Sequence, residues 1–364
     1  MKTSSLKKSI ALGAAVAALA LLPNLHAQVT VFVEGGSASQ NLLYDRATNL
    51  FAGGTFTSTG NQSSTVRRFQ GNSLNPNLTG YNPITLDINV ANGAINGLVA
   101  LVNQFADVND TNVTGAQVIP TFVDSATTPE AVGIDSVAAN LTELPTYVVP
   151  LVFVKSTSQP DLAGITNLTQ RQAVTLETST NKATYYGGTS SNYVYFVGRN
   201  KQAAVRTEVD LNIYNTSKIK TFTNNAAGQP VEDKNSSDPG LASGGAVANT
   251  VLALTNSIGT VAVQNIKSTL VPIAYEGVSY SVTNVINGSY PLWGYEHYYY
   301  ITSPNSGAPS TAQQAVIDAF YQSVTNSAFQ NINTPAFTNN FIPISALKVK
   351  RDIDGGQIKP LANF

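Results

Sequence analysis

The order of apolar and polar positions changes from a strand pattern to a helix pattern just beyond residue 27. Residues 29–33 are β-branched or aromatic, which predicts a short buried strand. Gly35 and Gly36 follow, and glycines permit a sharp turn and a close approach of a ligand to the backbone. Ser37 or Ser39 is then placed to cap a helix whose apolar face comprises Leu42, Leu43, Ala47 and Leu50. Such a turn presents backbone N–H groups and hydroxyls to an anion, although an ordinary strand–helix connection has the same pattern.

The two patterns alternate along the rest of the chain. Residues 145–154 form its most apolar stretch and predict a strand buried on both faces, and 60–71 and 221–240 predict polar turns or loops. Because strands and helices alternate, we expect an α/β chain with mostly parallel sheets. The other expected strands are 55–59, 84–90, 118–123, 193–197, 258–263, 271–275 and 290–300. The other expected helices are 94–105, 206–214, 246–255 and 311–324. Two more helices are expected from their caps, one that begins with Pro129 after the Thr128 cap and one that runs from the Thr169 cap to Leu176.

Residues 1–27 have the pattern of a secretory signal peptide. A lysine-bearing start is followed by an apolar run from Ile10 to Leu22 and by Leu25-His26-Ala27, a small-residue cleavage site before Gln28. Nothing later in the chain approaches the roughly 18 apolar residues that a transmembrane helix needs. We therefore expect an exported protein, periplasmic or secreted from a bacterium, without membrane insertion.

Charge and residue inventory exclude several function classes. Lys2, Lys7 and Lys8 leave with the signal, so the mature chain keeps 17 of 20 basic residues and has a net charge of 17 − 21 = −4. This balance, with 11% charged residues, does not suit a nucleic-acid-binding protein. The chain has no cysteine, and His297 is the only histidine beyond the signal, so Ser-His-Asp, Cys-His and multi-histidine zinc sites are disfavoured. We expect no catalytic site, no metal and no cofactor.

The remaining polar candidates share one place in the predicted fold. Each follows a predicted strand, and ligands of open α/β sheets bind beyond the carboxyl ends of the strands. We therefore expect one ligand site assembled from several strand ends, with the candidates Ser37, Ser39, Ser63, Ser64, Asp124, Ser125, Arg199 and Ser243.

The order of these motifs resembles that of the periplasmic phosphate-binding proteins of ABC transporters. VTVFVEGGSASQNLLYDRATNLF is similar to their first strand, anion loop and helix, and YVVPLVFVKSTSQPDLAGITNLTQRQAV to the entry into their second lobe. YFVGRNKQAAVRTEV lies where the family has an arginine and a Ser-Gly-Thr anion loop. SGGAVANTVLALTNSIGTVAV, NGSYPLWGYEHYY and ALKVKRDIDGGQIKP resemble later family segments, so the likeness covers nearly all of the chain beyond the signal.

The resemblance implies a type 2 periplasmic-binding-protein fold, which is a two-lobed α/β fold with two hinge strands. The hinges would lie near 148–154 and 259–263, with lobe I at 28–150 plus 267–364 and lobe II at 151–266. Carried over from the family, the residues that would hold phosphate or a similar oxyanion are Ser37, Ala38, Ser39, Ser63 or Ser64, Asp124 and Arg199. The resemblance also implies an ABC permease as partner and a monomeric protein.

One segment departs from the family. Ala203-Ala204-Val205 stands where the family has Ser-Gly-Thr, and the loss of two hydroxyl bonds to an anion costs about 1.5–3 kcal/mol each. Asp124-Ser125 also reverses the family's Ser-Asp order. A second hypothesis therefore remains, namely an exported structural or adhesive protein that has lost anion affinity. A hydrolase, such as an exported phosphatase, is the third and is disfavoured by the inventory.

Four of these features also have a simpler interpretation. Arg199 could form a surface ion pair, and Asp124-Ser125 could form an Asx-turn before the Thr128 cap. Arg67-Arg68 could add positive potential beside Ser63 and Ser64 or be solvated. The aromatic run 290–300 favours a strand with a buried aromatic face over a stacking surface.

Overall fold

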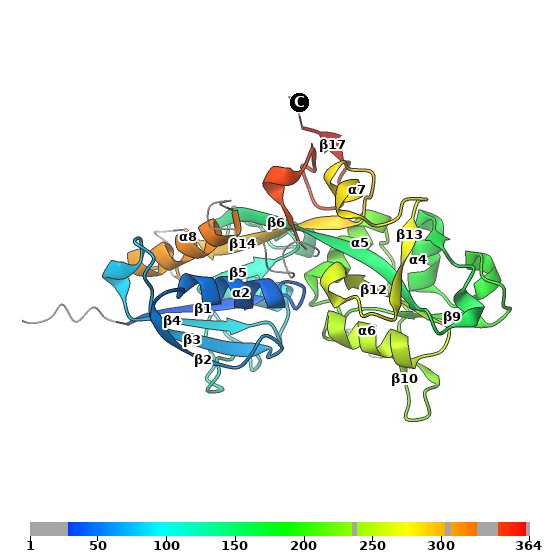
Figure 1. Ribbon diagram of the computed structural model, residues 1–364, viewed down its shortest axis with the longest axis horizontal. Coiled ribbons are helices and arrows are strands. Elements are labelled where there is room, and N and C mark those ends of the chain that lie inside the picture. The colour runs from blue at the N-terminus through cyan, green and yellow to red at the C-terminus, as the bar shows by residue number, and fades with distance from the viewer. Residues whose placement is uncertain (1–27, 235–238, 303–306, 326–340, 362–364) are drawn as a thin grey trace, which may run out of the picture.

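The computed structural model describes residues 28–234, 239–302, 307–325 and 341–361. The predicted signal peptide, 1–27, lies outside the described residues. Figure 1 shows two α/β bodies side by side, joined by the long strand β6 (Leu141–Ser156), which runs through both. The fold is therefore a mixed α/β fold of two parts. We propose that residues 28–150 and 267–364 form lobe I and that residues 151–266 form lobe II.

The sheet of lobe I is built around β1 (Val29–Gly35), which pairs in parallel with β4 (Ile84–Asn89) and β5 (Phe122–Ser125). Beyond β4 come β3 (Val66–Asn72) and β2 (Thr55–Thr59), both antiparallel. On the other side β5 pairs antiparallel with β14 (Trp293–Ile301). The helices packed on this sheet are α2 (Gln40–Leu50), α3 (Ala94–Asn103) and α8 (Thr311–Thr325). As expected, β1 leads through the glycine turn directly into α2.

In the second part, β12 (Ser257–Ala262) pairs in parallel with β9 (Tyr193–Val197) and antiparallel with the second half of β6. Strand β13 (Leu270–Tyr275) also pairs antiparallel with β6, and in parallel with β7 (Asn167–Leu168). Its helices are α4 (Gln170–Thr178), α5 (Ala204–Ile213) and α6 (Gly244–Ala253). Short elements complete the chain: β8 (Asn181–Lys182), β10 (Phe222–Asn224), β11 (Pro230–Glu232), α7 (Val282–Ile286), β15 (Ile342–Pro343), β16 (Val349–Lys350) and β17 (Lys359–Pro360).

The core lies along β6 and β14. Every residue of β6 from Thr146 to Ser156 is buried, which confirms the prediction of a strand covered on both faces. On β14, Trp293, Tyr298 and Tyr299 are almost fully buried, so the aromatic run belongs to the core, as favoured above. Side chains of this size dominate the apolar area that folding removes from water.

The expectation of mostly parallel sheets is wrong. Strands β6 and β14 run antiparallel to each other through the centre of the molecule, and β12 and β13 are antiparallel to β6. Periodicity predicts that a segment is a strand but not which strand pairs with it. A chain that crosses between two bodies and returns naturally places antiparallel strands at the crossing.

Three local predictions also need correction. Residues 66–72, expected to be part of a polar turn, form strand β3. Their sequence, VRRFQGN, has no clear alternation of apolar and polar residues. Part of the predicted loop 221–240 pairs as β10 and β11. Thr128 caps no α-helix; a short 3₁₀ turn, Glu130–Val132, follows Pro129 instead. The predicted Thr169 cap of α4 is confirmed.

Candidate functional site

The turn between β1 and α2 supplies the first wall of the candidate site. Ser39 occupies the N-cap position of α2, yet its hydroxyl donates to the carbonyl of Gly36 at 2.9 Å and caps no helix N–H. The first-turn N–H groups of α2 are therefore without a side-chain cap, at the end of the helix where the dipole favours negative charge. Ser37 and Ala38 precede it and are buried.

Arg199 supplies the opposite wall from lobe II. It lies just after β9 and is only 5% exposed. Its Nε donates to the carbonyl of Leu241 at 3.1 Å and its Nη2 to that of Ala242 at 2.9 Å, while Nη1 donates across the lobes to Ser37 Oγ at 3.2 Å. Burial lowers its pKa to about 10, so it remains charged at neutral pH.

The backbone is shaped to hold Arg199 in this position. Gly240 has a φ of +119°, and a methyl group on it would lie 2.4 Å from the carbonyl carbon of Arg199. Only glycine permits this approach. Among the described residues, no carboxylate forms an ion pair with Arg199, so the surface-ion-pair interpretation is wrong. Arg199 is instead a buried cation, held by neutral acceptors and aimed at the turn before α2.

The N-terminus of α6 meets the same point. Ser243 caps its own helix by accepting from Ala246 N at 3.1 Å, and Gly244 N lies 3.5 Å from Ser37 Oγ. Gln264 Nε2 donates to the Ser37 carbonyl at 2.9 Å. Ser37 Oγ is thus the acceptor on which donors from lobe II converge. This set of donors is the chemistry of an oxyanion site.

Asp124 lies beneath this site. Its carboxyl group is fully buried on β5, interacts with the side chains of Ser39 and Glu296, and lies 3.5 Å from the Tyr147 hydroxyl. Burial raises the pKa of Asp124 to about 7, although Ser39, Glu296 and Tyr147 act in the opposite direction. The pKa of Glu296 is also raised, by burial first and then by Asp124. Asp124 interacts with the Ser39 side chain rather than forming an Asx-turn, whereas the Ser125 hydroxyl is engaged in a turn of its own with Thr127.

Ser63 and Ser64 are not gathered with the others. They lie in the turn between β2 and β3, where both hydroxyls are bound to Asn61 Oδ1, at 2.7 and 3.3 Å. Only the backbone carbonyl of Ser64 reaches the start of α2, by accepting from Gln40 Nε2 at 3.2 Å. These two residues lie at the same sheet edge as the site but direct no hydroxyl toward it.

The arginine pair beside them is neither solvated nor placed to attract an anion. Arg68 forms a two-bond ion pair with Asp87, at 2.7 Å for each bond. Arg67 is fully buried and donates to the Gln40 carbonyl at 3.0 Å. Arg68 therefore joins β3 to β4, and Arg67 joins β3 to α2.

The alanines that replace the family's hydroxyl loop make an apolar contact between the lobes. Ala204, at the start of α5, packs in one buried cluster with Ala94 of α3 and Ala126. Beside it, Ile95 N donates to the Gln202 carbonyl at 3.3 Å. The lobes therefore meet directly here, and the missing hydroxyls are replaced by van der Waals contact.

Several site residues carry no sequence signal of their own. Gly244, Gln264, Glu296 and Tyr147 reach the site from distant segments. A buried glutamate inside the aromatic run 290–300 is the one irregularity that could have drawn attention to Glu296, because acids are rarely fully buried without a partner.

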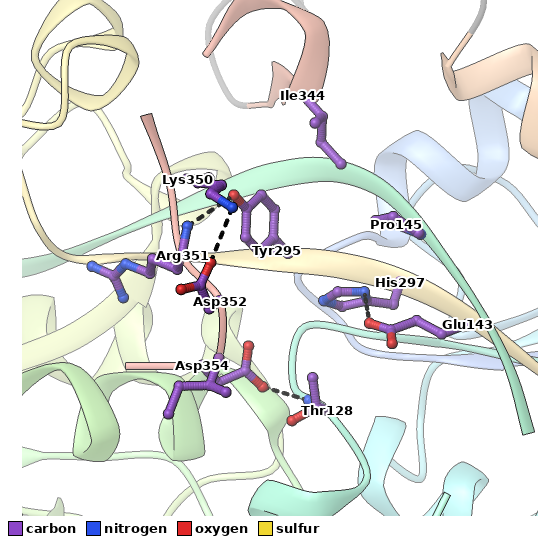
Figure 2. A pocket seen from close by; sticks show the side chains of 11 residues that line it. Thr128, Glu143, Pro145, Tyr295, His297, Ile344, Lys350, Arg351, Asp352 and Asp354 are labelled. Carbon is purple, nitrogen blue, oxygen red and sulfur yellow. Dashed lines mark hydrogen bonds and ion pairs between the residues drawn. The ribbon is translucent and has the colours of Figure 1, made fainter. Parts of the chain in front are cut away.

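Apart from this candidate site, a cavity of about 310 Å³ lies against β6, β14 and the segment 350–354. Figure 2 shows His297 and Glu143 on one side, with 2.7 Å between Nδ1 and Oε1, and Lys350 beside Asp352 on the other. Asp354 accepts from Thr128 N at 2.5 Å and closes the base. Because these charged groups are paired with one another, we place the candidate site at Arg199 rather than in this cavity.

In the part of the chain that the structure describes, no helix is long and apolar enough to cross a membrane. Over the same residues, no group of three or more His, Cys, Asp or Glu side chains is arranged to hold a metal ion.

Comparison with known proteins supports the fold through structure alone. No family model matches the chain, and no curated protein matches its sequence. A solved structure described as a phosphate ABC transporter substrate-binding protein of Clostridium perfringens, with bound phosphate, is similar with a TM-score of 0.56 and 13% identity, over 86% of this chain and 99% of that one. An ABC-type phosphate transport receptor of Vibrio cholerae is similar with a TM-score of 0.51 and 13% identity, over 83% and 96%. The chain thus has the fold of the type 2 periplasmic binding proteins.

Proposed function

We propose that this protein is an exported solute-binding protein that captures phosphate, or a similar small oxyanion, between its lobes for ABC-type uptake. The observation that carries the proposal is Arg199. It is a buried cation with no carboxylate ion pair among the described residues, and it faces the uncapped start of α2. Removing a cation from water costs several kcal/mol, and neutral acceptors offset only part of that cost. An anion at this point would offset the rest.

The donors present suit a tetrahedral oxyanion. Arg199 Nη1 and Gly244 N approach from lobe II, and the Ser37 hydroxyl and the first-turn N–H groups of α2, which have no side-chain cap, lie on the lobe I side. In the bound protein the anion would take the acceptor role that Ser37 Oγ has here. In its ionised form Asp124, which interacts with the Ser39 side chain, would accept a hydrogen bond from a protonated oxygen of the anion, and this favours an anion that still carries a proton.

Titration calorimetry of residues 28–364 with inorganic phosphate tests the proposal. We expect Arg199→Ala to weaken binding by about 100-fold, because a hydrogen bond to a charged group contributes about 1.5–3 kcal/mol. Arg171→Ala is the matched control, since Arg171 is exposed on α4 of the same lobe. Absence of heat from the unmodified protein at millimolar phosphate, or equal binding by the Arg199→Ala variant, would refute the assignment.

A second candidate rests on the contact of Ala204 with Ala94 and Ala126. This apolar contact joins the lobes directly, and the start of α5 offers no hydroxyl there because its N-cap residue is Ala203. It favours a binding-protein fold that has lost anion affinity and serves as an exported structural or adhesive protein. The calorimetric experiment above distinguishes the two, because this candidate gives no heat with phosphate.

A further inference from the structure

A groove beside Arg199 is lined almost entirely by neutral polar side chains. It has a volume of about 440 Å³ and lies between the lobes, with Asn92, Asn96, Asn109 and Thr111 from lobe I and Asn200 and Gln202 from lobe II. None of its lining residues is ionisable. The volume falls in the range of small-molecule sites in proteins.

Two amides of this groove, those of Asn92 and Asn96, are held in place by hydrogen bonds. Asn96 Nδ2 donates to the carbonyl of Asn92 at 3.1 Å and to its Oδ1 at 3.0 Å, and Asn92 Nδ2 in turn donates to the buried carboxylate of Asp110. On the opposite wall, Gln202 Oε1 is buried and has no hydrogen-bond partner among the described residues. A buried acceptor without a partner is costly, so its presence at the edge of a cavity points to a donor supplied by a ligand.

The groove is connected to the candidate anion site along the chain. Asn200 directly follows Arg199, and Gln202 directly precedes Ala203-Ala204-Val205, where donors to an anion are missing. Gly93 has a φ of +88°, and a methyl group there would lie 2.6 Å from the Gln202 carbonyl oxygen, so glycine lets this loop close against lobe I. Ala94, next to it, lies within 3.8 Å of a methyl group placed on Gly36 in the turn before α2.

From these observations we infer that the ligand is a phosphate monoester of a small sugar or polyol, with its hydroxyl groups in the amide groove and its phosphate at Arg199. The inference rests on the proposed function. Amide side chains donate and accept at once, and so match neighbouring hydroxyls, which do the same.

Calorimetry with three probes tests this inference. Glucose 6-phosphate should bind at least tenfold more tightly than methyl phosphate, which is an ester without hydroxyls, because two or more neutral hydrogen bonds contribute that much. In the Asn96→Ala, Gln202→Ala double variant this preference should fall to about onefold, while binding of inorganic phosphate stays unchanged. Asn103→Ala, on the same helix but outside the groove, should keep the preference.

The outcomes separate the two proposals. If inorganic phosphate binds but glucose 6-phosphate binds no better than methyl phosphate, the groove assignment is overturned and the oxyanion site stands. If the double variant keeps the preference for glucose 6-phosphate, the groove assignment is likewise overturned. If none of the three probes binds, both proposals fail.

Discussion

At the scale of the residue, burial shifts the pKa values of Arg199 and Asp124 in opposite directions. Arg199 is a cation whose acceptors are two carbonyls and one hydroxyl, and burial lowers its pKa to about 10. Asp124 is a carboxyl group among other acids and phenols, and burial raises its pKa to about 7. The ring hydroxyls of Tyr147 and Tyr298 and the carboxyl of Glu296 all lie close to it. Burial therefore disfavours the charge on both groups, but Arg199 remains charged at neutral pH, whereas Asp124 keeps its proton up to a pKa of about 7.

Replacing Asp124 should change how stability depends on pH. The folded protein keeps the Asp124 proton up to a pKa of about 7, whereas the unfolded chain releases it near the ordinary value of 3.8. The stabilising contribution is therefore complete below about pH 4 and is lost as the pH rises through 7. Asp124→Asn should flatten the fall in unfolding free energy between pH 4 and 7, by up to about 1.4 kcal/mol per pH unit.

Urea unfolding at several pH values measures this slope. Because Glu296 interacts with Asp124, Glu296→Gln should be measured in parallel, and the two single variants compared with the double variant. Equal slopes for the unmodified protein and Asp124→Asn would show that Asp124 is ionised in the folded state at pH 5.

At the scale of the element, helix N-termini are used in two different ways. The hydroxyl of Thr169 accepts from Gln172 N in a complete capping box, so α4 satisfies its own first turn. Ser39 has the same position on α2 but donates to Gly36 instead, and Ala203 offers α5 no hydroxyl at all. Helices α2 and α5 both begin near the contact between the lobes without a side-chain cap, so a ligand there could satisfy their first N–H groups.

The cap of α4 provides a test that is independent of ligand. Thr169→Ala should lower the unfolding free energy by about 1 kcal/mol, because the hydroxyl that caps the first turn is lost. Arg171→Ala, at an exposed position of the same helix, should be close to neutral, since alanine has the higher helix propensity. Chemical unfolding followed by circular dichroism measures both, and equal losses would contradict the assigned cap.

Elements were more predictable from sequence than their pairing. Between residues 29 and 50 the spacing of apolar residues changes clearly from that of a strand to that of a helix. The structure has both elements with nearly the expected bounds. Strand β3 was missed because its residues, VRRFQGN, bury Arg67 as well as Phe69, so the polar appearance of the segment conceals its inner face. A buried arginine that pairs with a backbone carbonyl cannot be recognised from a hydropathy pattern.

At the scale of the whole molecule, the lobes are held together by contacts from both sides of the cleft. The Arg199–Ser37 and Ile95–Gln202 hydrogen bonds flank the contact of Ala204 with Ala94 and Ala126. Figure 1 shows that β6 spans both bodies, so these contacts close a structure that is already connected by strands. Small side chains at this contact let the backbones approach closely.

A larger side chain at the contact should separate the lobes. Ala204→Leu adds three carbons to a filled space and should cost about 1–3 kcal/mol, which opening of the cleft would relieve. We expect a larger radius of gyration by small-angle X-ray scattering and about tenfold weaker phosphate binding. Ala226→Leu, exposed in the turn between β10 and β11, is the control and should change neither. An unchanged radius for Ala204→Leu would mean that the lobes do not separate here.

The sequence alone determined the local signals, namely the glycine turn into α2, the buried strand at 145–154, the Thr169 cap and the position of Arg199 after a strand. These depend on neighbouring residues, whose spacing along the chain fixes which side they face. Only the tertiary structure decided which signals meet. It brought Arg199 to Ser37 and Gly244, left Ser63 and Ser64 bound to Asn61, and set Ala204 against Ala94 and Ala126. Each of these contacts joins segments through a choice of strand partner and lobe orientation, and no local period encodes that choice.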